Sequence, residues 1–287
     1  MTKVATIAGS DASGGAGLEA DLKTFEEYGL YGMAAVTLVA TMDPDANWGH
    51  RVFPLDETAL RAQLETIFKG VGVAAAKSGM LGTFYAVELT REYIEGYGIQ
   101  NYVLDPVMVC KGAGEALNPE LNASLAEKLL PLAAVVTPNL FEAAQLSGLE
   151  SVSTQEEMRE AARLIAAKGA RTVFVKGGAK LYQAESSRTD SPQAPQTDSP
   201  QGATALDIFF DGVNFKALES PLIKTEWTHG AGCTTAAAIA SGLARGLSVY
   251  NAVVLAKRFI TESLSRSFPL NRWVGPGNPS GWRGEFR

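Results

Sequence analysis

Short apolar runs alternate with amphipathic stretches over the first 178 residues, and this alternation constrains the fold more than any other feature. The runs expected as strands are 3–8, 33–41, 74–80, 101–107, 133–139 and 171–178. The stretches expected as helices are 16–29, 57–69, 84–97, 119–130, 139–147 and 155–169. The alternation predicts right-handed βαβ units, hence an α/β fold with a mostly parallel sheet covered on both faces. Ligands bind such sheets at the carboxyl ends of the strands.

The pattern changes after residue 178. Two apolar runs flank Asp211-Gly212, which predicts an antiparallel hairpin at an edge of the sheet. Residues 183–203 repeat a Thr-Asp-Ser-Pro-Gln unit and hold almost no apolar residue, so we expect a mobile surface insertion. From residue 273 the chain is rich in Gly and Pro and is expected to form an irregular tail. With 287 residues, 46% of them hydrophobic, residues 1–287 are expected to form a single domain.

Net charge and composition limit the classes of partner that the protein is expected to bind. The net charge of −6 leaves no broad basic surface, so we expect no nucleic acid and no anionic membrane as a partner, but a small molecule. No apolar segment reaches 18 residues and the N-terminus lacks a signal-peptide pattern, so the protein is expected to be cytoplasmic. Two cysteines in a reducing compartment are expected to stay thiols.

Two segments that follow strands carry candidate site residues. "AGSDASGGAG" (8–17) opens a helix with small residues, and Asp11 can accept hydrogen bonds from a ligand hydroxyl or ring nitrogen. Its glycines do not have the GxGxxG spacing, which argues against a nicotinamide cofactor. In "LDPVMVCKGAG" (104–114), Asp105 ends a strand, where a carboxylate can reach a metal or a phosphate, and Cys110 follows it.

Two further strand ends carry polar side chains. In "VVTPNLFEAAQL" (135–146), Asn139 and Glu142 fall in the first turn of a helix. The pair fits a capping box as well as a ligand site, so both interpretations stay open from the sequence. Lys176 in "FVKGG" (174–178) stands where an ammonium can reach a phosphate, although an ordinary solvated lysine would look the same.

A glycine turn runs directly into an alanine-rich helix at "THGAGCTTAAAIASGLARG" (228–246), with Cys233 at its mouth. Such a turn offers backbone N–H groups that stabilise charge on a transferred phosphoryl group. A side chain at its tip can take the proton from the attacking hydroxyl, and the helix N-terminus is expected to lower the pKa of the Cys233 thiol. Together with the strand-end residues, this indicates a kinase without a Walker A sequence.

The order of these motifs, with "SGMLGT" (78–83) between the first and second, resembles the ribokinase-like superfamily and its vitamin kinases for hydroxymethylpyrimidine or pyridoxal. The resemblance covers residues 3 to about 260 apart from the insertion, and it implies a three-layer αβα fold with ATP and Mg²⁺ as cofactors. It implies Cys233 as the base and an anion hole formed by Gly230, Ala231 and Gly232. It further implies nucleotide contacts by Asn139, Lys176 and Thr228, a Mg²⁺ site at Asp105 and Glu142, and heterocycle contacts by Asp11 and the backbone near Met80.

Two features separate this chain from typical hydroxymethylpyrimidine kinases. These are "TMDPDANWGH" (41–50) and Cys110, and both are similar to a subgroup of pyridoxal kinases that uses two cysteines. The resemblance therefore implies phosphorylation of the 5′-hydroxymethyl group of pyridoxal, and relatives suggest a homodimer. The alternatives are a hydroxymethylpyrimidine or hydroxymethylpyrimidine-phosphate kinase and, from another class, a non-catalytic vitamin-binding protein.

Two residues are assigned to the acceptor side. Residues 41–53 read as a mobile flap, and His50 is expected to approach the ring when the flap closes, although a solvated loop histidine is about three times as common. Cys110 is expected to add reversibly to the aldehyde of pyridoxal and so tether it as a hemithioacetal. Its alternative role is that of a small buried hydrophobe.

Overall fold

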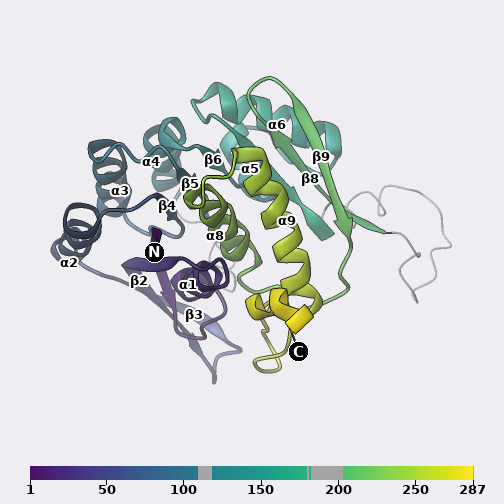
Figure 1. The fold of residues 1–287 in the computed structure, drawn as a ribbon, viewed down its shortest axis with the longest axis horizontal. Coiled ribbons are helices and arrows are strands. Elements are labelled where there is room, and N and C mark those ends of the chain that lie inside the picture. Colours follow the sequence, from purple (N-terminus) through teal and green to yellow (C-terminus); the bar gives the residue numbers. More distant parts are fainter. Residues whose placement is uncertain (109–117, 180, 182–202, 287) are drawn as a thin grey trace.

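In the computed structural model, a nine-stranded sheet organises the chain, and residues 1–108, 118–179, 181 and 203–286 are described (Figure 1). The strand order is β3-β2-β1-β4-β5-β6-β7-β8-β9. The bounds are β1 Lys3–Asp11, β2 Tyr31–Asp43, β3 Gly49–Pro54, β4 Ala75–Ser78, β5 Tyr102–Leu104, β6 Val135–Val136, β7 Val173–Gly177, β8 Thr204–Phe210 and β9 Phe215–Pro221. The insertion expected at 183–203 lies, apart from residue 203, outside the described residues.

The centre of the sheet is parallel and its two edges are antiparallel. Strands β2, β1, β4, β5, β6 and β7 run in one direction, whereas β3 pairs antiparallel with β2, and β8 and β9 pair antiparallel at the other edge. The hairpin predicted around Asp211-Gly212 is confirmed, with Gly212 at a φ of 93°. The carboxyl ends of the parallel strands therefore meet along one edge of the sheet.

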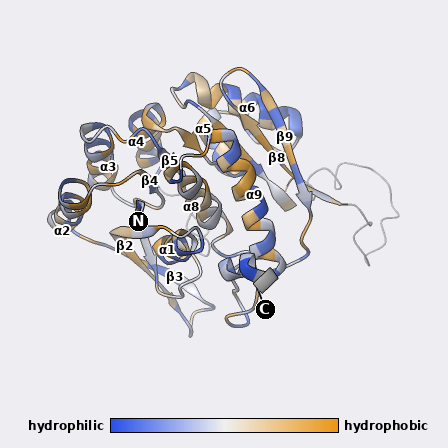
Figure 2. Ribbon diagram, viewed as in Figure 1, coloured by the Kyte–Doolittle hydropathy of each residue, from blue (hydrophilic) through white to orange (hydrophobic). Residues whose placement is uncertain are grey.

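Helices cover both faces of the sheet. One layer holds α2 Glu57–Leu64, α3 Phe84–Gly96, α4 Pro119–Leu129, α5 Leu140–Ser147 and α6 Gln155–Ala167. The other holds α1 Gly17–Glu27, α8 Ala231–Ala244 and α9 Val249–Ser265, which lie in front of the sheet in Figure 1. Figure 2 shows hydrophobic and hydrophilic residues side by side along α9, the pattern of a helix with one face on a core.

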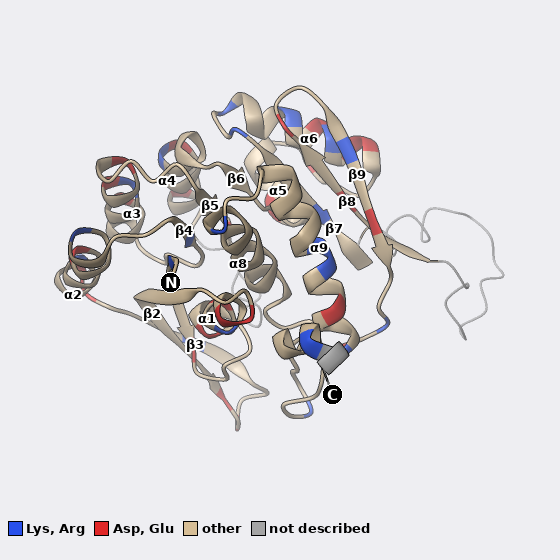
Figure 3. Ribbon diagram, viewed as in Figure 1, with Lys and Arg blue, Asp and Glu red and all other residues tan. Residues whose placement is uncertain are grey.

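Helix α8 lies deepest of these helices. It carries no charged side chain, which Figure 3 shows, and residues 234–243 are all buried. Its alanines and glycines let α1 and α9 approach closely, since a Cβ on Gly242 would lie 2.8 Å from the Cβ of Ala252. A helix that is apolar on all sides fits the interior of a domain. Its N-terminus reaches the edge where the parallel strands end.

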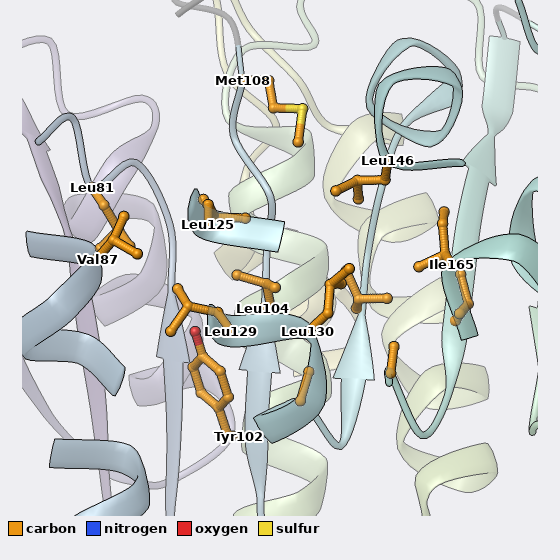
Figure 4. Packing of buried hydrophobic residues seen from close by; sticks show 14 of the residues in the cluster. Leu81, Val87, Tyr102, Leu104, Met108, Leu125, Leu129, Leu130, Leu146 and Ile165 are labelled. Atoms are coloured by element: carbon orange, nitrogen blue, oxygen red, sulfur yellow. The ribbon is translucent and has the colours of Figure 1, made fainter. Parts of the chain in front are cut away.

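The opposite layer is held by aliphatic packing. In Figure 4, Tyr102 and Leu104 of β5 lie beside Leu125, Leu129 and Leu130, and all five belong to one buried cluster. Leu129 and Leu104 have no exposed surface, so truncating either to alanine would cost about 2–5 kcal/mol of stability. This core fixes β5, and with it the strand end that precedes Asp105.

Three regions differ from the sequence-based expectation. Residues 41–53, expected as a mobile flap, form the end of β2, the turn after it and most of β3, a strand that had not been predicted. The helix expected at 57–69 ends as α2 at Leu64 and continues as a π-helical segment, Glu65–Val71. The tail from residue 273, expected to be irregular, ends in a 3₁₀ helix, Pro279–Phe286, that packs on α1 and α9. A second 3₁₀ turn spans Leu130–Leu132.

Among the residues that the structure describes, no helix combines the length and the hydropathy required to cross a bilayer.

Candidate active site

The strand-end residues predicted from the sequence gather at the edge where α8 begins. Asp105 directly follows β5, and its carboxylate accepts hydrogen bonds from the hydroxyl of Thr137 and the ammonium of Lys176, each at 3.1 Å. Lys176 reaches this point from β7, and a Cβ on Gly232 would lie 3.3 Å from its Nζ. A cation and an anion thus face each other beside the first turn of α8.

The environment keeps this pair ionised. Burial alone would raise the pKa of Asp105, but the ammonium groups of Lys176 and Lys77 outweigh it and hold that pKa below its usual value. Burial would lower the pKa of Lys176, yet Asp105 and Glu142 raise it above its ordinary value. The Lys176 side chain keeps 16% of its surface exposed, so the ammonium can still meet an incoming anion.

Asn139 and Glu142 form the capping box that was one of the two interpretations of their spacing. The Asn139 side chain accepts from the N–H of Glu142 at 3.0 Å, and a Glu142 oxygen accepts from the N–H of Asn139 at 2.8 Å. Burial, together with the nearby Asp105, raises the pKa of Glu142 to about 7 despite the Lys176 ammonium. A cation bound beside this carboxylate would lower its pKa and keep it ionised.

The turn before α8 is built by two glycine segments in contact. Gly230 is the N-cap with a φ of 73°, and a Cβ there would overlap the carbonyl oxygen of Gly15. The N–H of Ala231 donates to the carbonyl of Thr228 at 3.2 Å, so this amide is turned inward. The first-turn amide of Gly232 has no acceptor within the helix, as helix geometry dictates. These amides fit an anion, but Ala231 contributes less than the sequence suggested.

The Cys233 thiol departs from the expectation that the helix N-terminus would lower its pKa. Burial raises that pKa to about 11, although the ammonium of Lys77 and the N–H of Gly17 both act in the opposite direction. Partial charges at a helix end are worth less than about 1 kcal/mol at most sites, and desolvation of a thiolate exceeds this. The residue itself is partly exposed.

Asp11 already has several hydrogen-bond partners within the protein. Its carboxylate already accepts hydrogen bonds from the N–H groups of Ser13 and Ala16, both at 2.8 Å, and from Nε2 of His229 at 2.6 Å. Burial would raise the pKa of Asp11, but His229 and Ser13 lower it to about 2. Asp11 therefore shapes the glycine loop and orients His229, and a direct contact with a ligand stays a prediction.

Sequence reasoning missed His229, although it stands in the quoted "THGAGC" turn. Its backbone N–H donates to the carbonyl of Gly275 at 3.0 Å, and a Cβ on Gly15 would lie against its ring. The electrostatic influence of His229 and Asp11 on His50 places the β2–β3 hairpin on the same side of the site. Burial and then His229 lower the pKa of His50.

Met80 and Cys110 are the remaining residues predicted on the acceptor side. The backbone carbonyl of Met80, expected to hold a heterocycle, accepts the hydroxyl of Thr37 at 2.7 Å. Trp48 at the hairpin tip stacks on Trp273 with ring centroids 5.5 Å apart, which ties the hairpin to the tail. Cys110 lies outside the described residues.

A second ion pair beneath the α8 turn was also missed. Lys77 of β4 places its Nζ 2.9 and 3.1 Å from the two carboxylate oxygens of Asp21, and both side chains are fully buried. The hydroxyl of Thr6 donates to the same carboxylate at 2.6 Å. Burial on its own would lower the pKa of Lys77, but Asp21 raises it above its ordinary value.

The donor set can be tested against a divalent cation. Within the described residues, no three side chains of His, Cys, Asp or Glu gather as a metal cage. Mg²⁺ is commonly held by one or two carboxylates together with substrate phosphates and water. Asp105 and Glu142 interact electrostatically with each other and flank Lys176, so they fit a cation that arrives with a nucleotide.

The known proteins that resemble this chain include pyridoxine and pyridoxal kinases. Pyridoxine kinase of Bacillus subtilis is 48% identical over 99% of this chain and 97% of its own length. The crystal structure of an ADP complex of Bacillus subtilis pyridoxal kinase has a TM-score of 0.89 at 48% identity and covers 99% of both chains. Staphylococcus aureus pyridoxal kinase in complex with AMP-PCP and pyridoxal has a TM-score of 0.86 at 41% identity, covering 99% of this chain and 95% of that one.

These likenesses confirm the expected ribokinase-like α/β fold and the resemblance to vitamin kinases. The family model described as phosphomethylpyrimidine kinase matches residues 11–278, nearly the whole chain. This protein belongs to the phosphomethylpyrimidine kinase family.

Proposed function

We propose that this chain transfers the γ-phosphoryl group of ATP to the 5′-hydroxymethyl group of pyridoxal, and also of pyridoxine and pyridoxamine. The observation that carries the proposal is the Lys176–Asp105 pair at the first turn of α8, beside Cys233. The pyridoxine and pyridoxal kinases reported above, of which this chain shares nearly the full length, support the choice of acceptor.

The nucleotide side uses charge and backbone amides. Lys176 would contact the phosphates from its partly exposed ammonium, with Asn139 and Thr228 as further contacts. Asp105 and Glu142 would hold Mg²⁺, which neutralises the charge of the transferred phosphoryl group when it is bound. The backbone amides of the Gly230–Gly232 turn would bind the transferred phosphoryl group. In phosphoryl transfer, such positioning and charge stabilisation supply most of the catalysis.

The proton of the acceptor hydroxyl would pass to the sulfur of Cys233. In that step the O–H bond breaks, an S–H bond forms, and the oxygen bonds to the γ-phosphorus while the bond to the ADP oxygen breaks. Because the pKa of Cys233 is about 11, the reacting thiolate is a small fraction at neutral pH. Any group that favours this thiolate would raise the rate.

The acceptor side is assembled by the glycine loop and the β2–β3 hairpin. His229, oriented by Asp11, and the backbone near Met80 would contact the ring, and His50 would approach it from the hairpin. We propose that Cys110 tethers pyridoxal through its aldehyde as a hemithioacetal. Pyridoxine has an alcohol in that position and would bind by hydrogen bonds alone.

A second activity, phosphorylation of hydroxymethylpyrimidine or its phosphate, is favoured by the description of the family model itself. Both acceptors are flat rings with a hydroxymethyl group, so the same edge of the sheet can serve either. A non-catalytic vitamin-binding protein is disfavoured because Asp105, Lys176, Glu142 and Cys233 converge at one place. We further propose that residues 1–287 act as one kinase domain, in the cytoplasm and as a homodimer.

The test is a Mg-ATP assay with pyridoxal, pyridoxine, pyridoxamine and hydroxymethylpyrimidine under identical conditions. We expect ADP formation with the B6 vitamers at a higher kcat/KM than with the pyrimidine. Preference for the pyrimidine would select the second activity, and no turnover with any acceptor would select the binding protein. In the same assay, Cys110→Ala should weaken the use of pyridoxal far more than that of pyridoxine, and equal losses would contradict the tether.

A further inference from the structure

The fully buried Lys77–Asp21 pair has no role in the mechanism above. Both of its residues nevertheless act electrostatically on Cys233, the proposed base. Both side chains have no exposed surface, and the ammonium sits at 2.9 and 3.1 Å from the two carboxylate oxygens. The pair cannot meet a ligand from solvent. Its influence has to act through neighbouring groups of the protein.

Helix α1 connects the pair to the thiol. The start of α1 lies against the start of α8, because a Cβ on Gly230 would lie 3.0 Å from the Cα of Ala16, and Asp21 follows Gly17 by one turn on α1. Residues four apart lie on the same helix face. Lys77 approaches from β4, where the absence of a side chain at Gly79 leaves room for its Nζ, because a Cβ there would lie 2.8 Å from that atom.

The energetics argue against a purely structural role. Replacing a buried ion pair by apolar side chains is often neutral or stabilising, because desolvating two charges offsets most of their attraction. The buried pair of Lys257 and Asp207 serves a visible structural purpose, since Asp207 also binds the N–H groups of Gly177 and Gly178. The pair of Lys77 and Asp21 lies instead between the strand ends and the α8 turn.

Four charged groups on the surrounding elements act electrostatically on the sulfur. They are Lys77 from β4, Asp21 from α1, Asp105 from the end of β5 and Lys176 from β7. Two ammonium groups and two carboxylates balance one another in the free enzyme. Removing any one of them leaves a net charge beside the thiol in a medium of low dielectric constant.

We propose that Lys77 is a positioning residue whose buried ammonium balances the negative charge of the Cys233 sulfur before it takes the acceptor proton. The proposal rests on the proposed role of Cys233 as the base. Lys77 increases the fraction of molecules that hold a thiolate, and Asp21 moderates this effect while keeping the ammonium in place. The two residues therefore act on the thiol in opposite directions.

The test measures the rate at which iodoacetamide alkylates Cys233 in the free enzyme, on a Cys110→Ser background, from pH 7 to 10. Lys77→Met should slow alkylation at a fixed pH by about tenfold or more. Asp21→Asn should accelerate it by about tenfold. A structural disturbance would move both variants in one direction, so shifts of the same sign or no shift in either would overturn the proposal.

The control is Lys128→Met, which breaks the Lys128–Glu88 ion pair between α4 and α3, in the helical layer opposite to Cys233, and should leave the alkylation profile unchanged. If Lys77→Met does not fold, Asp21→Asn decides the question alone, because slower or unchanged alkylation would refute the proposal. With substrates present, Lys77→Met should lower kcat and leave the KM for ATP near its original value. Since alkylation needs no turnover, an inactive or misassigned kinase would not be mistaken for failure of the charge balance.

Discussion

Lys176 and Lys77 serve the same edge of the sheet with opposite accessibility. Lys176 contacts one oxygen of Asp105 at 3.1 Å and keeps part of its side chain in solvent. Lys77 contacts both oxygens of Asp21 and has no exposed surface. Both act electrostatically on the thiol of Cys233 between them. The difference shows that a lysine can serve two purposes, depending on its exposure. A partly exposed lysine can bind an anionic ligand, whereas a fully buried one can only change the electrostatic potential at neighbouring groups.

The contrast between the two lysines predicts that they contribute unequally to the stability of the fold. Lys77→Met leaves the buried Asp21 without its counter-ion, which should cost about 3–5 kcal/mol in the free energy of unfolding. Lys176→Met should cost only about 1–2 kcal/mol, because the Lys176 side chain keeps 16% of its surface exposed and the ammonium of Lys77 still acts on Asp105. Urea titrations of both variants check this, and equal losses would contradict the distinction.

The thiol between the lysines gives the largest effect on turnover. Cys233→Ala removes the proposed proton acceptor, so kcat should fall by about 100-fold or more while ATP still binds. Single-turnover kinetics and nucleotide binding by calorimetry separate the two quantities. Near-normal turnover would remove Cys233 from the mechanism.

Lys176, whose side chain is partly exposed, should matter more for nucleotide binding than for stability. Lys176→Met removes a charged contact to phosphate, so kcat/KM for ATP should fall by about 30-fold. Lys128→Met serves as a control, because that ammonium lies in the last turn of α4 and pairs with Glu88 of α3. The contrast between the two lysines would be lost if Lys77→Met raised the KM for ATP as much as Lys176→Met does.

The smallest expected effect is the pH dependence of Mg²⁺ affinity that arises from Glu142, the carboxylate near Lys176. The pKa of Glu142, raised to about 7, means that roughly one tenth of the groups are ionised at pH 6 and nine tenths at pH 8. The apparent affinity for Mg²⁺ should therefore fall by about tenfold from pH 8 to pH 6, as measured by Mg²⁺ titration of activity. Glu142→Gln should abolish this dependence.

Stability should change in the opposite sense to the affinity. The folded pKa of Glu142 lies above its unfolded value, so the native state binds more protons than the unfolded state between about pH 4.5 and pH 7. This contribution to stability is present below that window and is lost as the pH rises through it. A Glu142→Gln variant whose stability varies with pH as the original protein does would contradict the assigned pKa.

The sheet was largely predictable, because alternating runs and the Asp-Gly turn at residues 211 and 212 are local signals. Strand β3 was not, since Asp, Pro, Asn and Gly dominate residues 43–49 and its pairing with β2 is a tertiary feature. Asn47 and Trp48 take positive φ values of 50° and 63° at that tip, a conformation that no residue preference of tryptophan suggests. The hairpin reads from the sequence as a loop.

The site was predictable where a polar residue ends a strand, as Asp105 and Lys176 do. Lys77 lies inside "AAAKSGM", where one charge in an apolar run gives no sign of a buried partner 56 positions earlier. The pKa of Cys233 was expected to fall because the helix N-terminus is visible in the sequence, whereas the burial that raises it is not. Partners distant in sequence and degrees of burial are properties of the assembled fold.

The hydrogen bond between Asp11 and His229 has a consequence for how the protein is made. Its two residues are 218 positions apart, and His229 is held in turn by the carbonyl of Gly275. A chain emerging from the ribosome carries the β1 loop long before its partner exists, and chains of this size fold through partly ordered intermediates. The Asp11–His229 contact, and the acceptor site proposed beside it, can therefore form only near the end of synthesis.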